Sequence, residues 1–195
     1  MSRRAWKVDD NEPRLREEFR ASAILNCTGL GSAEMHGAQM YPLRGALVRV
    51  INDGSRMPKI DEAHCVPHPY GSTEQDMVFI VPRGENMLLL GGLTEEDEWS
   101  LDIGLHNHQP VRDMYRRCLD FMPVLEQAQL DPHEPVRVGL RPVGAGNVCL
   151  EQEAGTSIVH NYGHGGSGFS LSWGCAHEVE ANVMRELSYT RRRAA

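Results

Sequence analysis

The sequence lacks the features that identify disulfide-rich, zinc-binding, membrane-spanning and nucleic-acid-binding proteins. Its five cysteines are widely separated and form no C-x-x-C pair, which argues against a zinc ribbon or a secreted disulfide framework. No apolar run approaches the roughly 20 residues needed to cross a bilayer, and the first residues, MSRRAWK, contain no apolar signal core. Acidic residues outnumber basic ones, 27 against 20, so the chain lacks the basic field that nucleic acid requires.

The remaining composition is typical of a globular protein. Hydrophobic residues make up 41% and charged residues 24% of the 195 residues, enough for a core of moderate size. The last residues, RRRAA, do not match the Ser-Lys-Leu peroxisomal address. We therefore expect a cytoplasmic protein, with a peroxisomal location left open, that contacts neither membrane nor nucleic acid.

Helical and strand-like patterns alternate along the chain and predict a mixed α/β fold. Helices are expected over 14–19 and 111–122 and from Leu171 onward, where the apolar spacing is helical. Apolar, β-branched runs predict strands over 21–27, 46–51, 77–82, 87–92, 135–143 and 156–161. The runs at 77–82 and 87–92 flank a short turn and are expected to form an antiparallel hairpin. The stretch 54–76, rich in proline, glycine, histidine and serine, is expected to be a loop over the site.

Two glycine-containing turns follow predicted strands and are candidates for contact with a ligand. Gly29 and Gly31 follow 21–27, which we expect to be a buried parallel strand, and Ser32 stands where a helix cap is expected. The second turn lies between a strand and a helix and contains Gly163, Gly165, Gly166 and Gly168. Its backbone N–H groups can approach a ligand closely, beside a helix N-terminus that favours negative charge. The alternative is a turn that needs positive φ, which explains one or two glycines better than four.

Arg141 is the charged residue best placed to bind a substrate. It stands between Leu140 and Pro142 in an apolar stretch, so its guanidinium is expected to face a cavity, where a carboxylate can accept two hydrogen bonds from it. From composition alone, a structural ion pair with one of the many acidic residues is an equal alternative.

The histidines give no metal site by their spacing. His64 with His68 and His106 with His108 form close pairs, but no third and fourth ligand follow at a useful distance along the chain. We expect these pairs to be solvated, and His160 and His164 to order the glycine-rich turn.

The segment from His160 to Ala176, HNYGHGGSGFSLSWGCA, closely resembles the C-terminal signature of the D-amino acid and D-aspartate oxidases. Four more segments resemble landmarks of that family in the same order: NCTG at 26–29, GALVRV at 45–50, GG at 91–92 and GLRPV at 139–143. The resemblance covers about residues 20–185.

The resemblance implies a Rossmann-like FAD-binding domain that is interrupted by an antiparallel substrate-binding domain. Residues 1–44 and 141–195 would form part of the first, and residues 45–140 the second. Nothing before residue 20 supplies the βαβ unit with G-x-G-x-x-G that holds the ADP half of FAD. We therefore expect a truncated or split form that binds flavin poorly by itself, and that associates with a missing N-terminal half or with itself.

The same resemblance assigns roles to individual residues. Flavin would contact Thr28 and the run Gly165, Gly166, Ser167, Gly168, Phe169 and Ser170. Arg141 would pair with the substrate carboxylate, and the backbone carbonyl of Gly166 would accept the substrate amine. Phe79 stands on the substrate side where the family usually has a tyrosine that assists carboxylate binding, with Tyr70 as a speculative substitute. No side chain is expected to act as an acid or base, because the protein aligns the substrate with the cofactor.

The implied activity is the FAD-dependent oxidation of a D-amino acid by molecular oxygen to a 2-oxo acid, with release of ammonia and hydrogen peroxide. Two alternatives stay open. One is an amine oxidase similar to glycine or sarcosine oxidase, and the other is a non-catalytic binding or assembly module built on the same fold.

Overall fold

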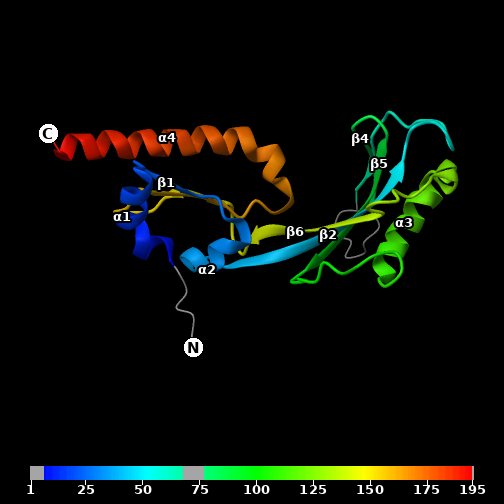
Figure 1. The fold of residues 1–195 in the computed structure, drawn as a ribbon, viewed down its shortest axis with the longest axis horizontal. Helices are drawn as coiled ribbons and strands as arrows, with labels where there is room; N and C mark the ends of the chain where they lie inside the picture. The colour runs from blue at the N-terminus through cyan, green and yellow to red at the C-terminus, as the bar shows by residue number, and fades with distance from the viewer. Residues whose placement is uncertain (1–6, 68–76, 195) are drawn as a thin grey trace. The chain divides into compact units, whose positions relative to one another are not determined.

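The computed structural model describes residues 7–67 and 77–194. The chain divides into two compact units, one formed by residues 1–42 with 141–195 and the other by residues 43–140. Both units combine helices with a β-sheet, so the chain has the mixed α/β fold that the sequence predicts (Figure 1). No helix in the described part of the chain is long and apolar enough to cross a membrane.

The unit of residues 43–140 is built on a mainly antiparallel sheet. Its strand order is β3 (His64–Val66), β4 (Val78–Arg83), β5 (Met87–Glu96), β2 (Met40–Ile51) and β6 (Val136–Gly144). β4 and β5 form the predicted hairpin, with Gly84 in the turn at a φ of +62°. Helix α3 (Gln109–Phe121) has a proline in its first turn and packs against β4 and β5, and a 3₁₀ turn, Pro123–Gln127, follows it.

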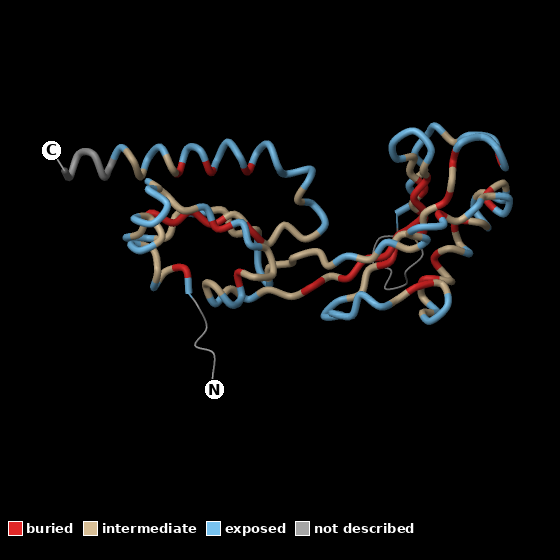
Figure 2. Tube along the Cα trace, in the orientation of Figure 1, coloured by how far each residue is buried: buried red, intermediate tan, exposed pale blue. Residues whose placement is uncertain are grey.

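An apolar core holds this unit together. The α3 residues Val111, Met114 and Cys118 form the buried stripe that the helical spacing predicts. They pack with buried strand residues, which Figure 2 shows in red. The buried residues of this core are Ala46, Val48, Val50, Met57, Val78, Ile80, Leu88, Leu90, Leu93, Val111, Met114, Cys118 and Leu125.

The other unit contains a three-stranded sheet with a parallel pair. Its strand order is β1 (Ile24–Asn26), β8 (Ile158–Tyr162) and β7 (Cys149–Gln152), with β1 parallel to β8 and β7 antiparallel to β8. Helix α4 (Gly168–Ala194) packs against β7 and β8. Helices α1 (Val8–Phe19) and α2 (Ser32–His36) contact each other on the other side of the strands (Figure 1).

Some predicted boundaries in this unit are wrong. Helix α1 begins at Val8 rather than at residue 14, and Pro13 lies inside it without ending it. The helix is tied to the sheet by Glu12, which accepts a hydrogen bond from the Ser157 N–H at 2.8 Å, and by Arg16, which donates to the Ser157 hydroxyl at 2.9 Å.

Three further expectations need correction, and one strand was missed. The strand predicted over 21–27 is only Ile24–Asn26, and Leu25 is 50% exposed because β1 is an edge strand in the described residues. Ser32 lies inside α2 rather than capping it. Strand β7 was missed because CLEQ is short and mixes apolar with polar residues. Part of the predicted loop forms β3, whereas His68 and Tyr70 fall outside the described residues.

Candidate active site

The candidate site lies where the parallel strands β1 and β8 end. Asn26 pairs with His160 in the strand register, so the turns that follow the two strands leave the sheet at the same edge. Such carboxyl-terminal edges are where α/β sheets bind ligands. Gly29 in the first turn has a φ of +58°, and a Cβ at this position would lie 3.4 Å from the Cβ of Pro142. The segment that carries Arg141 therefore reaches the same edge.

The glycine-rich turn after β8 needs glycine at two positions for its backbone conformation. Gly163 and Gly165 have φ values of +86° and +55°, which other residues rarely adopt. A Cβ at Gly163 would also lie 3.5 Å from the Gly144 backbone, and the Gly144 N–H donates to the Gly163 carbonyl at 3.4 Å. A turn that needs positive φ thus explains two of the four glycines.

Gly166 and Gly168 do not have positive φ, so backbone conformation does not explain why glycine stands at these two positions. The spacing of Gly163, Gly165 and Gly168 is G-x-G-x-x-G, between a strand and a helix. This match is not a complete dinucleotide fingerprint, because no second strand follows α4 in the described residues. The N-terminus of α4 nevertheless points its first backbone N–H groups toward this turn.

Arg141 lies directly against the glycine-rich turn. A Cβ at Gly166 would be 3.4 Å from Cδ and 3.7 Å from Nε of Arg141, so glycine makes room for the guanidinium stem. The Nη1 atom of Arg141 is buried and has no hydrogen-bond partner among the described residues. Burial lowers the pKa of this guanidinium from its ordinary value. The structural ion pair considered as an alternative is absent from the described residues, and a carboxylate ligand would supply the missing acceptor.

The turn and the start of α4 present an exposed surface. Gly166, Ser167 and Ser170 are exposed, and Phe169 is 95% exposed. A large apolar side chain in this position gains nothing from the fold of the described residues. The surface therefore combines an exposed aromatic ring, accessible backbone and a helix N-terminus.

Thr28 belongs to a hydrogen-bond network under the first turn. Its N–H and its hydroxyl both donate to Asn26 Oδ1, at 3.3 and 2.7 Å, and its hydroxyl lies 2.9 Å from that of Ser32. Since a backbone N–H can only donate, Asn26 turns its oxygen to Thr28 and its NH₂ to His160 Nδ1, 3.1 Å away. His160 Nδ1 is then an acceptor, and Nε2 carries the proton. Burial lowers the pKa of His160, which favours this neutral form.

His164 and Phe79 complete the set of predicted residues. His164 forms an isolated bridge with Val143, and its Nε2 lies 3.4 Å from Cys175 Sγ, which connects the turn to α4. Phe79 lies in the other unit, on β4, where it is paired with Gly91 of β5. Its predicted contact with substrate stays a prediction.

One of the closely spaced histidines, His108, is not solvated as expected. His108 is half-buried, and its Nε2 lies 2.9 Å from Glu95. Glu95 also accepts hydrogen bonds from the buried Arg44 at 3.0 and 2.7 Å. His108 therefore belongs to a polar network inside the unit of residues 43–140, which the short spacing to His106 did not reveal.

Comparison with known proteins shows the family of the chain. The family model described as FAD dependent oxidoreductase, DAO, matches residues 2–181. The chain is 39% identical to a D-amino-acid oxidase of Rubrobacter xylanophilus over 172 residues, which cover 86% of this chain and 48% of that protein. It is 33% identical to a D-amino acid oxidase of Dugesia ryukyuensis, covering 80% and 43% of the two chains. The chain thus spans about half the length of these curated relatives.

Solved structures share the fold. Glycine oxidase from Geobacillus kaustophilus superposes with a TM-score of 0.65 at 22% identity, over 85% of this chain and 42% of that one. An L-alpha-glycerophosphate oxidase from Mycoplasma pneumoniae with FAD bound gives a TM-score of 0.58 at 15% identity, over 83% and 42%. The architecture is therefore a partial Rossmann-like domain together with an antiparallel-sheet domain, and the chain belongs to the DAO family of FAD-dependent oxidoreductases.

Proposed function

We propose that the chain forms the flavin-facing and substrate-facing part of an oxidase that converts a D-amino acid and oxygen to a 2-oxo acid, ammonia and hydrogen peroxide. The observation that carries the proposal is the buried, unpaired Nη1 of Arg141 beside Gly166. The similarity to proteins named D-amino-acid oxidases, at 39% and 33% identity, supports the choice of substrate.

The residues of the glycine-rich turn fit FAD as the cofactor. Thr28, Gly165, Gly166, Ser167, Gly168, Phe169 and Ser170 would hold it. The exposed Phe169 ring and the exposed backbone at Gly166 offer a surface that a flat aromatic group can cover. When bound, FAD would supply the two-electron oxidation of the substrate, with oxygen as the final electron acceptor.

The side chains would act by binding and orientation. Arg141 donates two parallel hydrogen bonds to the substrate carboxylate, and the burial of its Nη1 strengthens this contact because little water competes. The Gly166 carbonyl accepts a hydrogen bond from the substrate amine. Together with the Arg141 contact to the carboxylate, this hydrogen bond fixes the orientation of the substrate Cα–H bond. We expect no imidazole to act as a base: His160 Nδ1 lies 3.1 Å from the Asn26 NH₂ group, and His164 Nε2 lies 3.4 Å from Cys175 Sγ.

Phe79 bears on substrate choice. Because phenylalanine has no hydroxyl, this chain would offer the carboxylate one hydrogen bond fewer than a tyrosine at the same position. The imine product hydrolyses in water without help from a side chain. The similarity to glycine oxidase structures is one of fold, so an activity on glycine or sarcosine is tested directly rather than inferred.

The curated relatives are about twice as long as this chain. The edge of strand β1 is a place where the additional part could bind. Strand β1 is paired on one side only in the described residues, and Leu25 on it is half-exposed. An unpaired edge of a parallel sheet offers a row of backbone donors and acceptors to another strand. We infer that a segment with the dinucleotide fingerprint adds its strand there, on the same polypeptide or a different one.

The test is an oxidase assay with matched arginine variants. The chain is co-expressed with the N-terminal half of a D-amino-acid oxidase relative, and peroxide is measured with D-alanine, D-aspartate, glycine and sarcosine. Arg141→Ala should raise KM for D-amino acids at least about 30-fold, because loss of a buried charged hydrogen bond costs 2 kcal/mol or more. Arg137→Ala, which removes an exposed arginine paired with Glu134, should leave KM unchanged.

Three outcomes would contradict the proposal. Equal KM values for the two variants would remove the substrate role of Arg141. Peroxide from glycine or sarcosine alone would favour the amine-oxidase alternative. Absence of a flavin absorbance band from the purified assembly would favour the non-catalytic module.

A further inference from the structure

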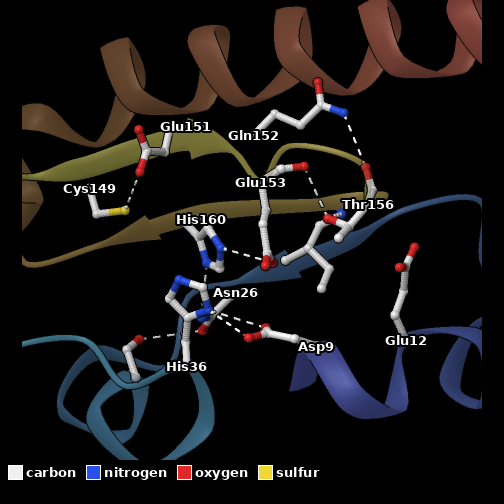
Figure 3. A network of polar contacts seen from close by, with 12 residues as sticks. Asp9, Glu12, Asn26, His36, Cys149, Glu151, Gln152, Glu153, Thr156 and His160 are labelled. Atoms are coloured by element: carbon white, nitrogen blue, oxygen red, sulfur yellow. Dashed lines mark hydrogen bonds and ion pairs between the residues drawn. The ribbon is translucent and has the colours of Figure 1, made fainter. Parts of the chain in front are cut away.

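A second cluster of polar side chains lies in the unit of residues 1–42 and 141–195, and none of its members is among the residues assigned to flavin or substrate. Asp9 comes from α1, His36 from the end of α2, Glu153 follows β7, and His160 lies on β8 (Figure 3). One ligand atom each of His36, Glu153 and His160 lie within 4.8 Å of one another. Both carboxylate oxygens of Asp9 are 3.1 Å from His36 Nδ1. Four elements thus bring two imidazoles and two carboxylates together.

The carboxylates of the cluster are not balanced by lysine or arginine. Within the described residues, neither Asp9 nor Glu153 forms an ion pair with these residue types, and each has a histidine beside it, at 3.1 Å for Asp9 and 3.5 Å for Glu153. Asp9 and Glu153 are close enough to interact, and two ionised carboxylates so placed repel each other. His160 is held in its neutral form by the Asn26 NH₂ group at Nδ1. A cation in this position would remove the repulsion.

Two buried atoms in the cluster lack partners. His160 is 1% exposed, yet its Nε2 has no hydrogen bond, and neither has Glu153 Oε2. The two atoms face each other at 3.5 Å, which is beyond a good hydrogen bond. Buried polar atoms normally have hydrogen-bond partners, so two neighbouring buried atoms that both lack one require an explanation.

We propose that Asp9, His36, Glu153 and His160 form a binding site for one divalent transition-metal ion, with Zn²⁺ as the best match. Imidazole and carboxylate are ligands that Zn²⁺ uses, at about 2.1 Å. Two ligands at that distance on a tetrahedral ion are about 3.4 Å apart. The separations of 3.1 Å between Asp9 and His36 and of 3.5 Å between Glu153 and His160 agree with this spacing.

Metal binding would change the tautomer of His160. The ion takes the Nε2 lone pair, so the ring proton moves to Nδ1 with no net change in bound protons. Nδ1–H then needs an acceptor, which the Asn26 amide supplies when it turns its oxygen toward His160. This turn gives up the 3.3 Å hydrogen bond from the Thr28 N–H. Occupancy of the metal site is therefore linked to the Thr28 turn through a single side chain.

The proposed ligands are too far apart in the sequence to be recognised as a metal site. The ligands stand at 9, 36, 153 and 160, whereas sequence patterns for zinc rely on pairs a few residues apart. The parallel pairing of β1 with β8 and the contact of α1 with α2 bring them together. The metal ion is inferred without reference to the proposed oxidase activity, so its test needs no turnover.

The experiment is a Co²⁺ and Zn²⁺ titration of the untagged full chain after removal of metal by a chelator. Co²⁺ should produce visible absorption bands of a four- or five-coordinate ion that saturate at one equivalent, Zn²⁺ should displace it, and the Tm should rise. His36→Ala and Glu153→Gln should each weaken affinity at least about 100-fold, since even an outer partner of a metal ligand is worth 10–100-fold. His133→Ala removes an exposed histidine and should change nothing.

Two results would overturn the proposal. One is the absence of a saturable one-to-one cobalt spectrum in a folded wild-type chain. The other is equal affinity of wild type, His36→Ala and Glu153→Gln, which would place any bound ion elsewhere. Circular dichroism of each variant separates loss of a ligand from loss of the fold.

Discussion

The two compact units have interiors of different chemistry. In residues 43–140 the buried set is dominated by aliphatic side chains from β2, β4, β5 and α3. In residues 1–42 with 141–195 the buried aliphatic set is small, and polar residues share the interior: Asn26, Ser32, Ser157, His160 and Asn182. The first unit is therefore stabilised mainly by apolar burial, whereas the second depends on the completeness of its hydrogen bonds.

Unpaired buried atoms sharpen this contrast. Among the described residues, the polar unit contains four with such atoms: Arg141, Glu153, His160 and Asn161. In the apolar unit they belong to Arg49 and Arg117, and Arg49 is otherwise paired with Asp131 and Glu134. The difference agrees with the proposal that the polar unit binds ligands. We expect a cofactor, a substrate carboxylate and a metal ion to supply what its own side chains do not.

The largest expected effect is in the apolar unit. Leu90→Ala removes a side chain with 0% exposure from β5 and should reduce the free energy of unfolding by about 2–5 kcal/mol. Leu101→Ala is the matched control, because Leu101 is exposed and should change it by less than about 0.5 kcal/mol. Urea unfolding followed by circular dichroism measures both. Similar losses for the two variants would contradict an apolar core centred on β5.

A smaller effect is expected from the glycine-rich turn. Gly165→Ala places a side chain at a φ of +55°, with its Cβ 3.3 Å from Val143 Cγ2, and should cost about 1–2 kcal/mol. Gly146→Ala meets no atom within 4 Å and has no positive φ, so it should be close to neutral. The same urea experiment compares them. If Gly146→Ala were as costly as Gly165→Ala, backbone strain at the turn would not be the cause.

Local patterns predicted the apolar unit well. β4 begins with alternating buried and partly buried residues, β5 is buried over six successive residues, and the buried residues of α3 recur at helical spacing, so the apolar pattern of the sequence indicates all three elements. Strand β7 and the full length of α1 were not predictable in this way. Their stability comes from contacts over long sequence distances, such as Glu12 with Ser157, and periodicity does not encode such contacts.

In the candidate site, too, local sequence features could be predicted and long-range contacts could not. Arg141 and the glycines were identified because each breaks a local rule, a charge in an apolar run or glycines in excess of what a turn needs. The Asn26–His160 pair was missed although both residues lie in recognised motifs, because the motifs alone do not show that β1 and β8 are parallel neighbours. The ligands of the proposed metal site were missed for the same reason, since none is close to another in the sequence except Glu153 and His160.

The smallest expected effect on stability tests whether the exposed surface of the polar unit belongs to a ligand. Phe169→Ser should change the free energy of unfolding of the chain without FAD by less than about 0.5 kcal/mol, because the ring is 95% exposed. In the co-expressed assembly the same change should weaken FAD binding, measured by flavin fluorescence. Phe19→Ser, at an exposed position at the end of α1, should alter neither quantity. A large loss of stability from Phe169→Ser would mean that the fold itself uses the ring. Unchanged FAD affinity would remove Phe169 from the cofactor surface, and the contrast between the units would then rest on Arg141 and the polar interior alone.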